Sequence, residues 1–214
     1  ANAKASGEYA AAIGGDAKAD KTHAIAIGSV AHAQEESSLA MGNLAKATNT
    51  YAYAIGGNAQ AKGRWSIAMG TNAVAEDDAS VAIGTWSNAT SGQSAAVGYQ
   101  AKAKALGATA LGRLTNVTAV DGTAIGSSTS VTGLNGTAIG NKANVTVKNG
   151  VAIGNEANAK NENAVAIGSG SETAAAVGTT SETVNGEIHN FAGINPTSTC
   201  LLYTSDAADD SLRV

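Results

Sequence analysis

A glycine recurs at every fourteenth position along most of this chain. The residue before each of these glycines is aliphatic or Met, and the residue before that is Ala. A strict period of this kind is typical of a solenoid, in which near-identical units stack on one another. We therefore predict that residues 1–178 form one quasi-linear repeat domain. The glycines are Gly14, Gly28, Gly42, Gly56, Gly70, Gly84, Gly98, Gly112, Gly126, Gly140, Gly154 and Gly168.

The repeat unit has the pattern of β-strands and not of a helix. Val81 and Ile83 lie two residues apart with Ala82 between them, so a strand would place both on one face and Ala82 on the other. Fourteen residues also equal two heptads, but the alternating three and four spacing of a coiled-coil seam is missing. One glycine in each unit would cost a helix roughly 1 kcal/mol per repeat.

Each unit is predicted to hold two short strands. The first carries the aliphatic residues, a turn follows at glycine as in Gly57-Asn58, and the second has the form Ala-x-Ala, whose alanines face the same way. Coils stacked in register would pair each strand with its equivalents about 4.8 Å above and below. The fold class is therefore an all-β parallel β-roll, or β-solenoid, about 55 Å long.

We interpret the two strand faces as an aliphatic core and an alanine packing surface. The predicted core of the roll consists of Ile27, Ile55, Ile83, Ile125, Ile139, Ile153 and Ile167. Because so thin a slice buries little surface, the alanines are predicted to pack against other copies in a cyclic homo-oligomer. These alanines are Ala26, Ala40, Ala54, Ala68, Ala82, Ala96, Ala110, Ala124, Ala138, Ala152 and Ala166.

The repeat resembles a known family. The units Ser80-Val81-Ala82-Ile83-Gly84 and Ala164-Val165-Ala166-Ile167-Gly168 are similar to the head repeat of the YadA-like trimeric autotransporter adhesins of type Vc secretion. The resemblance implies a left-handed β-roll, a homotrimer, and a place on the bacterial surface at the tip of a coiled-coil stalk held by an outer-membrane barrel. It also links the Val-Ala-Ile-Gly repeats with collagen binding, cell adhesion and virulence.

The ends of the chain depart from the repeat. Residues 179–199 look like the head-to-neck connector of that family, and we expect the neck and any C-terminal membrane anchor to lie outside this chain. Residues 200–214, from Cys200 onward, resemble the translation of a sequencing adapter and are predicted to be non-native. Ala1–Ala5 are in phase with the alanines near Lys18, so the chain is expected to begin inside a repeat.

Enzymatic chemistry is not expected. The net charge of −4 indicates no nucleic-acid partner. His23 and His32 fall at different repeat phases without carboxylates or thiols at ligand spacing, and the acidic run Glu76–Asp78 is typical of a solvated loop. Hexapeptide acyltransferases also form β-helices, but their period of six is missing. We expect no catalytic residues, no cofactor and no metal.

Two columns of surface residues are the candidate ligand-binding positions. Lys18, His32, Lys46 and Lys102 share one repeat phase, and His23, Tyr51 and Trp65 share another, next to Arg64. Exposed aromatic and Arg side chains are common anchors for protein ligands, although packing against the adjacent coil explains them equally well. The predicted ligand-binding residues are Trp65, Arg64, Tyr51, Lys18, Lys46 and Lys102.

These patterns favour a non-catalytic adhesin head. It would attach the bacterium to host extracellular matrix or host cells, and to sister cells in autoagglutination. The alternative is a purely structural spacer or phage-fibre β-solenoid that sets a length and binds nothing.

Overall fold

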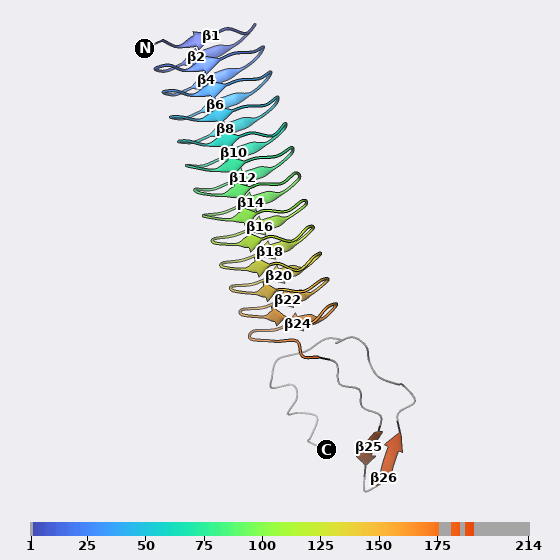
Figure 1. The fold of residues 1–214 in the computed structure, drawn as a ribbon. Helices are drawn as coiled ribbons and strands as arrows, with labels where there is room; N and C mark the ends of the chain where they lie inside the picture. Colours follow the sequence, from blue (N-terminus) through green and yellow to red (C-terminus); the bar gives the residue numbers. More distant parts are fainter. Residues whose placement is uncertain (1, 176–180, 185–186, 191–214) are drawn as a thin grey trace.

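The computed structural model describes residues 2–175, 181–184 and 187–190, and its first range winds into a parallel β-solenoid of about twelve turns (Figure 1). The described residues include no helix. Each coil contributes one strand of three residues and one of two residues, and the two kinds form separate parallel sheets of 12 strands each. The all-β parallel solenoid with two strands per repeat is therefore confirmed.

The long-strand sheet contains the even-numbered strands. They are β2 (Ala11–Ile13), β4 (Ile25–Ile27), β6 (Leu39–Met41), β8 (Tyr53–Ile55), β10 (Ile67–Met69), β12 (Val81–Ile83), β14 (Ala95–Val97), β16 (Thr109–Leu111), β18 (Thr123–Ile125), β20 (Thr137–Ile139), β22 (Val151–Ile153) and β24 (Val165–Ile167). Its register steps by one repeat, so Ala68 pairs with Ala82 and with Ala54.

The short-strand sheet contains the odd-numbered strands. They are β1 (Lys4–Ala5), β3 (Lys18–Ala19), β5 (His32–Ala33), β7 (Lys46–Ala47), β9 (Gln60–Ala61), β11 (Val74–Ala75), β13 (Asn88–Ala89), β15 (Lys102–Ala103), β17 (Asn116–Val117), β19 (Ser130–Val131), β21 (Asn144–Val145) and β23 (Asn158–Ala159). The same register holds here, so Asn88 lies between Val74 and Lys102.

A separate antiparallel pair, β25 (Ser181–Val184) and β26 (Glu187–Asn190), falls within the predicted connector, for which the sequence had suggested no strands. The predicted end of the repeat domain at Gly178, most of the connector and the tail at residues 200–214 lie outside the described residues. The three domain boundaries therefore stay predictions.

The predicted assignment of core and packing surface was wrong, because the two faces of the long-strand sheet are exchanged. Every predicted packing alanine is fully buried, with no exposed surface, inside a single chain. These are Ala26, Ala40, Ala54, Ala68, Ala82, Ala96, Ala110, Ala124, Ala138, Ala152 and Ala166. The predicted core residues are instead half-exposed at Ile27, Ile55, Ile83 and Ile125 and 36–37% exposed at Ile139, Ile153 and Ile167.

The physical reason is the small space between the two sheets. Alanines of both sheets fill it, and the small residue before each long strand is also buried, as at Ala24 and Ser80. The Ser80 hydroxyl donates to the carbonyl oxygen of Asp77 at 2.6 Å, so this buried polar group is satisfied. With Ala82 and Ser80 pointing inward, strand alternation turns Val81 and Ile83 outward.

The interior stays filled where the repeat departs from alanine. Val117, Val131 and Val145 replace the inner alanine of three consecutive short strands and are fully buried. The small residue before the facing long strand is there Gly. A Cβ placed on Gly136 would come within 2.9 Å of Val131 Cγ1 and 2.8 Å of Val145 Cγ1. Each larger side chain is thus accommodated by a smaller one, which keeps the packing close without overfilling the core.

The corners of the coil follow a period of seven residues. A residue with positive φ occurs at each seventh position from Tyr9 to Asn163, and 22 of these residues are not glycine. A left-handed residue with a side chain costs roughly 1–2 kcal/mol, and a β-branched one such as Val30 is a clear outlier. Each repeat therefore consists of two similar halves, each of which ends in a left-handed corner.

The recurring glycine has a separate role just before one of these corners. Gly56 has a φ of 130°, and a Cβ on it would lie 2.7 Å from the carbonyl carbon and oxygen of Gly70 in the next coil. Both the dihedral angle and the closeness of the neighbouring backbone require glycine. The equivalent glycines along the chain share this geometry, which explains why the fourteen-residue period has no exceptions.

We predict that Gly56→Ala destabilises the solenoid by roughly 3 kcal/mol, because it adds both backbone strain and a clash with Gly70. The matched control is Gly57→Ala, where a Cβ meets nothing nearer than the Thr71 methyl at 3.9 Å. We expect the control to change the free energy of unfolding by no more than about 0.5 kcal/mol. Chemical denaturation followed by circular dichroism measures both, and equal effects would contradict the steric explanation.

Candidate binding surface

Four side chains around one corner of the solenoid enclose an aromatic hollow of about 240 Å³, lined by Tyr51, Tyr53, Trp65 and Ile67. Tyr51 and Trp65 occupy left-handed corner positions in consecutive coils, with φ of 56° and 55°. Tyr53 and Ile67 come from β8 and β10 and point away from the alanine interior. The corner geometry therefore leaves Tyr51 and Trp65 44% and 55% exposed.

Arg64 borders the aromatic hollow and is held in place from two sides. Its guanidinium carbon lies 5.0 Å from the centre of the Trp65 ring, within the range of a cation–π contact. Its Nη2 and Nε donate to Asp78 Oδ2 at 2.6 and 3.0 Å, and its backbone N–H donates to Asp78 Oδ1 at 2.9 Å. This arrangement presents one cation and one indole side by side.

The ion pair changes the titration of both partners. The hydrogen bonds from the Arg64 side chain and backbone, more than the charge alone, hold the pKa of Asp78 below its ordinary value. The same side-chain hydrogen bond raises the pKa of Arg64. Both side chains are about half-exposed, at 53% for Arg64 and 41% for Asp78, so solvent screens the pair and its main effect is to orient the guanidinium.

The structure brings together three of the six predicted ligand-binding residues. Tyr51, Arg64 and Trp65 meet at the aromatic hollow. Sequence reasoning missed Tyr53, because it assigned that strand position to the core. The aromatic at this position was nevertheless a usable signal, since a core built from alanine cannot hold a tyrosine.

The three predicted lysines lie elsewhere, on the outer surface of the short-strand sheet. His32 pairs with both Lys18 and Lys46 in the register, so these three residues form a continuous column. Lys102 is several coils away, beside Asn88. The His32 Nε2 lies 2.5 Å from Asp20 Oδ2, which places a carboxylate within the first column.

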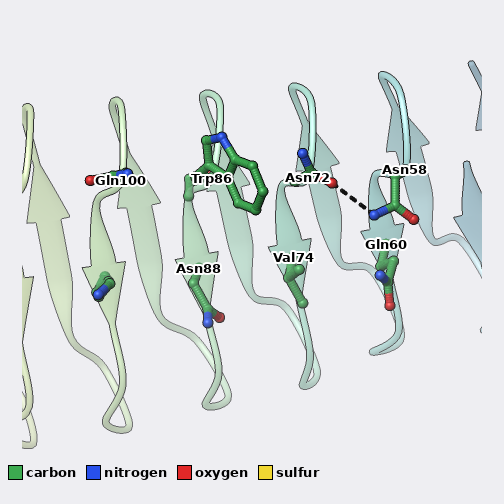
Figure 2. A pocket seen from close by; sticks show the side chains of 9 residues that line it. Asn58, Gln60, Asn72, Val74, Trp86, Asn88 and Gln100 are labelled. Atoms are coloured by element: carbon green, nitrogen blue, oxygen red, sulfur yellow. Dashed lines mark hydrogen bonds between the residues drawn. The ribbon is translucent and has the colours of Figure 1, made fainter.

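A second depression, the amide groove, lies on the outer surface of the short-strand sheet and has a volume of about 460 Å³ (Figure 2). One side comes from corner residues of four consecutive coils, and the floor comes from the strand residues two positions later. Trp86 is not among the predicted ligand-binding residues. The lining consists of Asn58, Asn72, Trp86, Gln100, Gln60, Val74, Asn88, Lys102 and Ser87.

The described residues contain no group of three His, Cys, Asp or Glu side chains able to hold a metal ion. Within the same part of the chain, no helix is long and apolar enough to cross a membrane. The aromatic hollow and the amide groove offer stacking surfaces, amides and single cations. Such groups are suited to holding a ligand in place.

The solenoid with its exposed corner residues belongs to the class of repeat proteins that present extended binding surfaces. The family model that describes the YadA head domain repeat matches residues 5–31, 33–59, 47–64, 61–85, 89–115, 118–143 and 148–171. The chain therefore belongs to the YadA head domain repeat family. A comparison with curated proteins found no match.

We predict that the Asp78 carboxyl titrates at a lower pH than in an Arg64→Gln variant, since glutamine removes the guanidinium. Because the folded-state pKa is depressed, the contribution of the pair to stability is present above the unfolded-state pKa and disappears as pH falls through the folded-state value. NMR of the Asp78 carboxyl carbon measures both midpoints. An unchanged midpoint in the variant would contradict the pairing.

Proposed function

We propose that this chain is the head of a homotrimeric, non-catalytic adhesin on the bacterial surface, wound as a left-handed roll. Membership of the YadA head domain repeat family supports this function. The single observation that carries the proposal is an apolar outer surface on the long-strand sheet, which the single chain leaves open to solvent.

The apolar outer surface follows the solenoid for roughly 50 Å, since strands in a sheet lie about 4.8 Å apart. The last residue of each long strand is aliphatic or Met and forms a continuous apolar column. The first residue adds a mixed column, which is apolar at Ile25 and Leu39 but carries Thr at positions 109, 123 and 137. The exposed fractions reach 62% at Ile13, 43% at Leu111 and 41% at Met69. A monomeric soluble protein rarely exposes a continuous apolar strip of this extent.

A trimer explains how this surface is covered. Each chain offers one nearly flat apolar side, and three such sides placed around a common axis would exclude water from all of them. The buried alanines, which we first assigned to the subunit contact, are then free to serve the interior of each chain. The corner residues and the outer surface of the short-strand sheet would stay accessible.

We expect the double substitution Ile139→Asp with Ile153→Asp to convert the trimer into monomers, because two carboxylates would be buried in an apolar contact. These residues are register partners on the long-strand sheet. Circular dichroism should still report a β-solenoid, because both side chains point away from the interior. Sedimentation velocity measures the mass.

The matched control is Ser130→Asp with Asn144→Asp, which places two carboxylates on register partners of the opposite outer surface. We expect it to remain trimeric. A wild-type chain that sediments as a soluble monomer, or a control that dissociates equally, would reject the proposed contact.

We further propose that the aromatic hollow binds a host extracellular matrix protein or cell-surface receptor, and that sister heads associate through the same exposed corners. Tyr53 and Ile67 lie at the margin of the apolar surface, whereas Tyr51, Trp65 and Arg64 form the outer rim. Aromatic and Arg side chains gathered around one apolar hollow are the commonest hot spots of protein interfaces.

Trp65→Asn combined with Arg64→Ala should weaken binding to a matrix protein about tenfold or more. Asparagine suits this corner because Asn135 and Asn149 occupy the same repeat position with positive φ. Surface plasmon resonance against immobilised collagen, laminin and fibronectin measures the loss. The control Leu114→Asn removes an exposed apolar side chain from a different corner, outside the aromatic hollow, and should leave binding intact.

Unchanged binding in the Trp65 variant would reject the aromatic hollow as the anchor. Absence of binding by the parent trimer to all three matrix proteins would favour a purely structural spacer.

A further inference from the structure

We propose that the amide groove is a carbohydrate-binding site that takes a short oligosaccharide, with one pyranose ring stacked on Trp86. The site lies on the short-strand sheet and depends neither on the trimer nor on the aromatic hollow. Its volume of about 460 Å³ is within the 300–1,000 Å³ typical of ligand pockets. Figure 2 shows the Trp86 ring leaning from its own coil toward the coil that carries Asn72 and Val74.

Trp86 supplies the stacking surface. It occupies a left-handed corner with a φ of 61° and is 53% exposed. The fold gains little from a bulky exposed ring at this strained position, where Asn58 and Asn72 fit without difficulty in neighbouring coils. Aromatic faces suit the apolar C–H side of a sugar ring, while the sugar hydroxyls at the ring edge require polar partners.

Amides supply those partners. Asn58, Asn72 and Gln100 line the corner side of the groove, and Gln60 and Asn88 line its floor. Asn58 Nδ2 already donates to Asn72 Oδ1 at 2.8 Å (Figure 2), which leaves the Asn58 oxygen and the Asn72 amide nitrogen for a ligand. Amides combine donors and an acceptor, which matches hydroxyl groups that do the same. No carboxylate lines the groove, and Lys102 adds a further donor at one end. Successive coils are about 4.8 Å apart, comparable to one sugar unit, so a linear oligosaccharide along the axis would meet a new amide at each coil.

Asn88 provides the observation that points most directly to a ligand. Its Oδ1 is buried and accepts no hydrogen bond, and it is the one buried side-chain polar atom among the described residues without a partner. At the equivalent position of a later coil, Asn158 Oδ1 does have a partner, because it accepts from Asn144 Nδ2 at 3.2 Å. Asn88 pairs in the register with Lys102 and with Val74, and the Val74 side chain has no polar atom.

An unpaired buried acceptor costs free energy and is retained where it serves a function. Rotation of the Asn88 amide would turn Oδ1 from its buried position toward the groove, where a hydroxyl of a bound sugar would donate to it. The missing partner and the exposed indole lie in the same groove, in the corner and strand of one coil. The two observations are independent of each other, and both are explained by one stacked, hydrogen-bonded ring.

The test begins with the full chain on an array of immobilised oligosaccharides that includes β-galactosides, N-acetylglucosamine oligomers, mannosides and uronate-containing glycans. Calorimetry with the free form of the strongest binder then gives the dissociation constant. We expect Trp86→Asn to weaken binding about tenfold or more. Asn88→Val should weaken it about fivefold while melting no lower than the parent, because valine already occupies this strand position at Val74.

Two matched controls isolate the groove. Leu114→Asn changes the same corner position two coils beyond Trp86, and Trp65→Asn removes the tryptophan of the aromatic hollow; both should bind as the parent does. Absence of binding to every glycan, or binding that Trp86→Asn leaves unchanged, would overturn the proposal. Equal losses in both tryptophan variants would also overturn it. Loss of matrix-protein binding in Trp65→Asn alone leaves the carbohydrate site standing, so the two proposals fail separately.

Discussion

The narrow space between the two sheets is the constraint on which the rest of this structure depends. Most inward positions hold only a methyl or hydroxymethyl group, and the larger exceptions are the buried Thr115 and Thr129 and three valines. Where valine is present, as at Val131, the glycine at position 136 leaves room for it. Every coil must therefore repeat the same small residues. The backbone also closes tightly at Gly56, where the next coil excludes a Cβ. These two steric limits explain why the sequence repeats every fourteen residues.

A second consequence is that the side chains at the corner positions differ widely from coil to coil. The parallel ladders fix the strands, and each seventh residue turns the chain through a left-handed conformation. That conformation directs the side chain away from the interior, so its identity is not restricted by packing. Tyr51, Trp65 and Trp86 all occupy such corners. The solenoid can therefore vary its surface chemistry from coil to coil without changing its fold, at the cost of some backbone strain.

Much of the fold could be predicted from the sequence, because a period of two identifies strands and a period of fourteen identifies their stacking. Which side of the strand faces inward could not be obtained from alternation, which is symmetric with respect to the two sides. We assumed that the larger apolar residues point inward. The position of Ile83 also carries Met and Leu in other coils, whereas the position of Ala82 never varies, and the invariant position is the confined one.

The candidate binding surface was only partly predictable for related reasons. Repeat phase placed Tyr51 and Trp65 in neighbouring coils, and adjacency in sequence placed Arg64 beside them. The amide groove was not predicted, because it combines corner residues with residues of the following strands on one surface. The unpaired acceptor of Asn88 depends on its neighbour being Val74, a relation between residues fourteen positions apart. Contacts of this kind form between side chains of neighbouring coils, so they depend on the pairing of coils in the sheet and cannot be predicted from the sequence of one repeat.

The exchange of inner and outer residues also changes where the stability of the molecule originates. Alanine methyls bury little area, so each coil gains only a small hydrophobic contribution to offset the ordering of fourteen residues. The larger aliphatic side chains are on the outside and contribute their transfer free energy only when another chain covers them. Association then adds to the stability of the folded chain by mass action. Because the association that we propose uses only the long-strand sheet, the opposite sheet is free to carry polar columns. The same division accounts for the polar residues Ser130 and Asn144 on one sheet and the apolar residues Ile139 and Ile153 on the other.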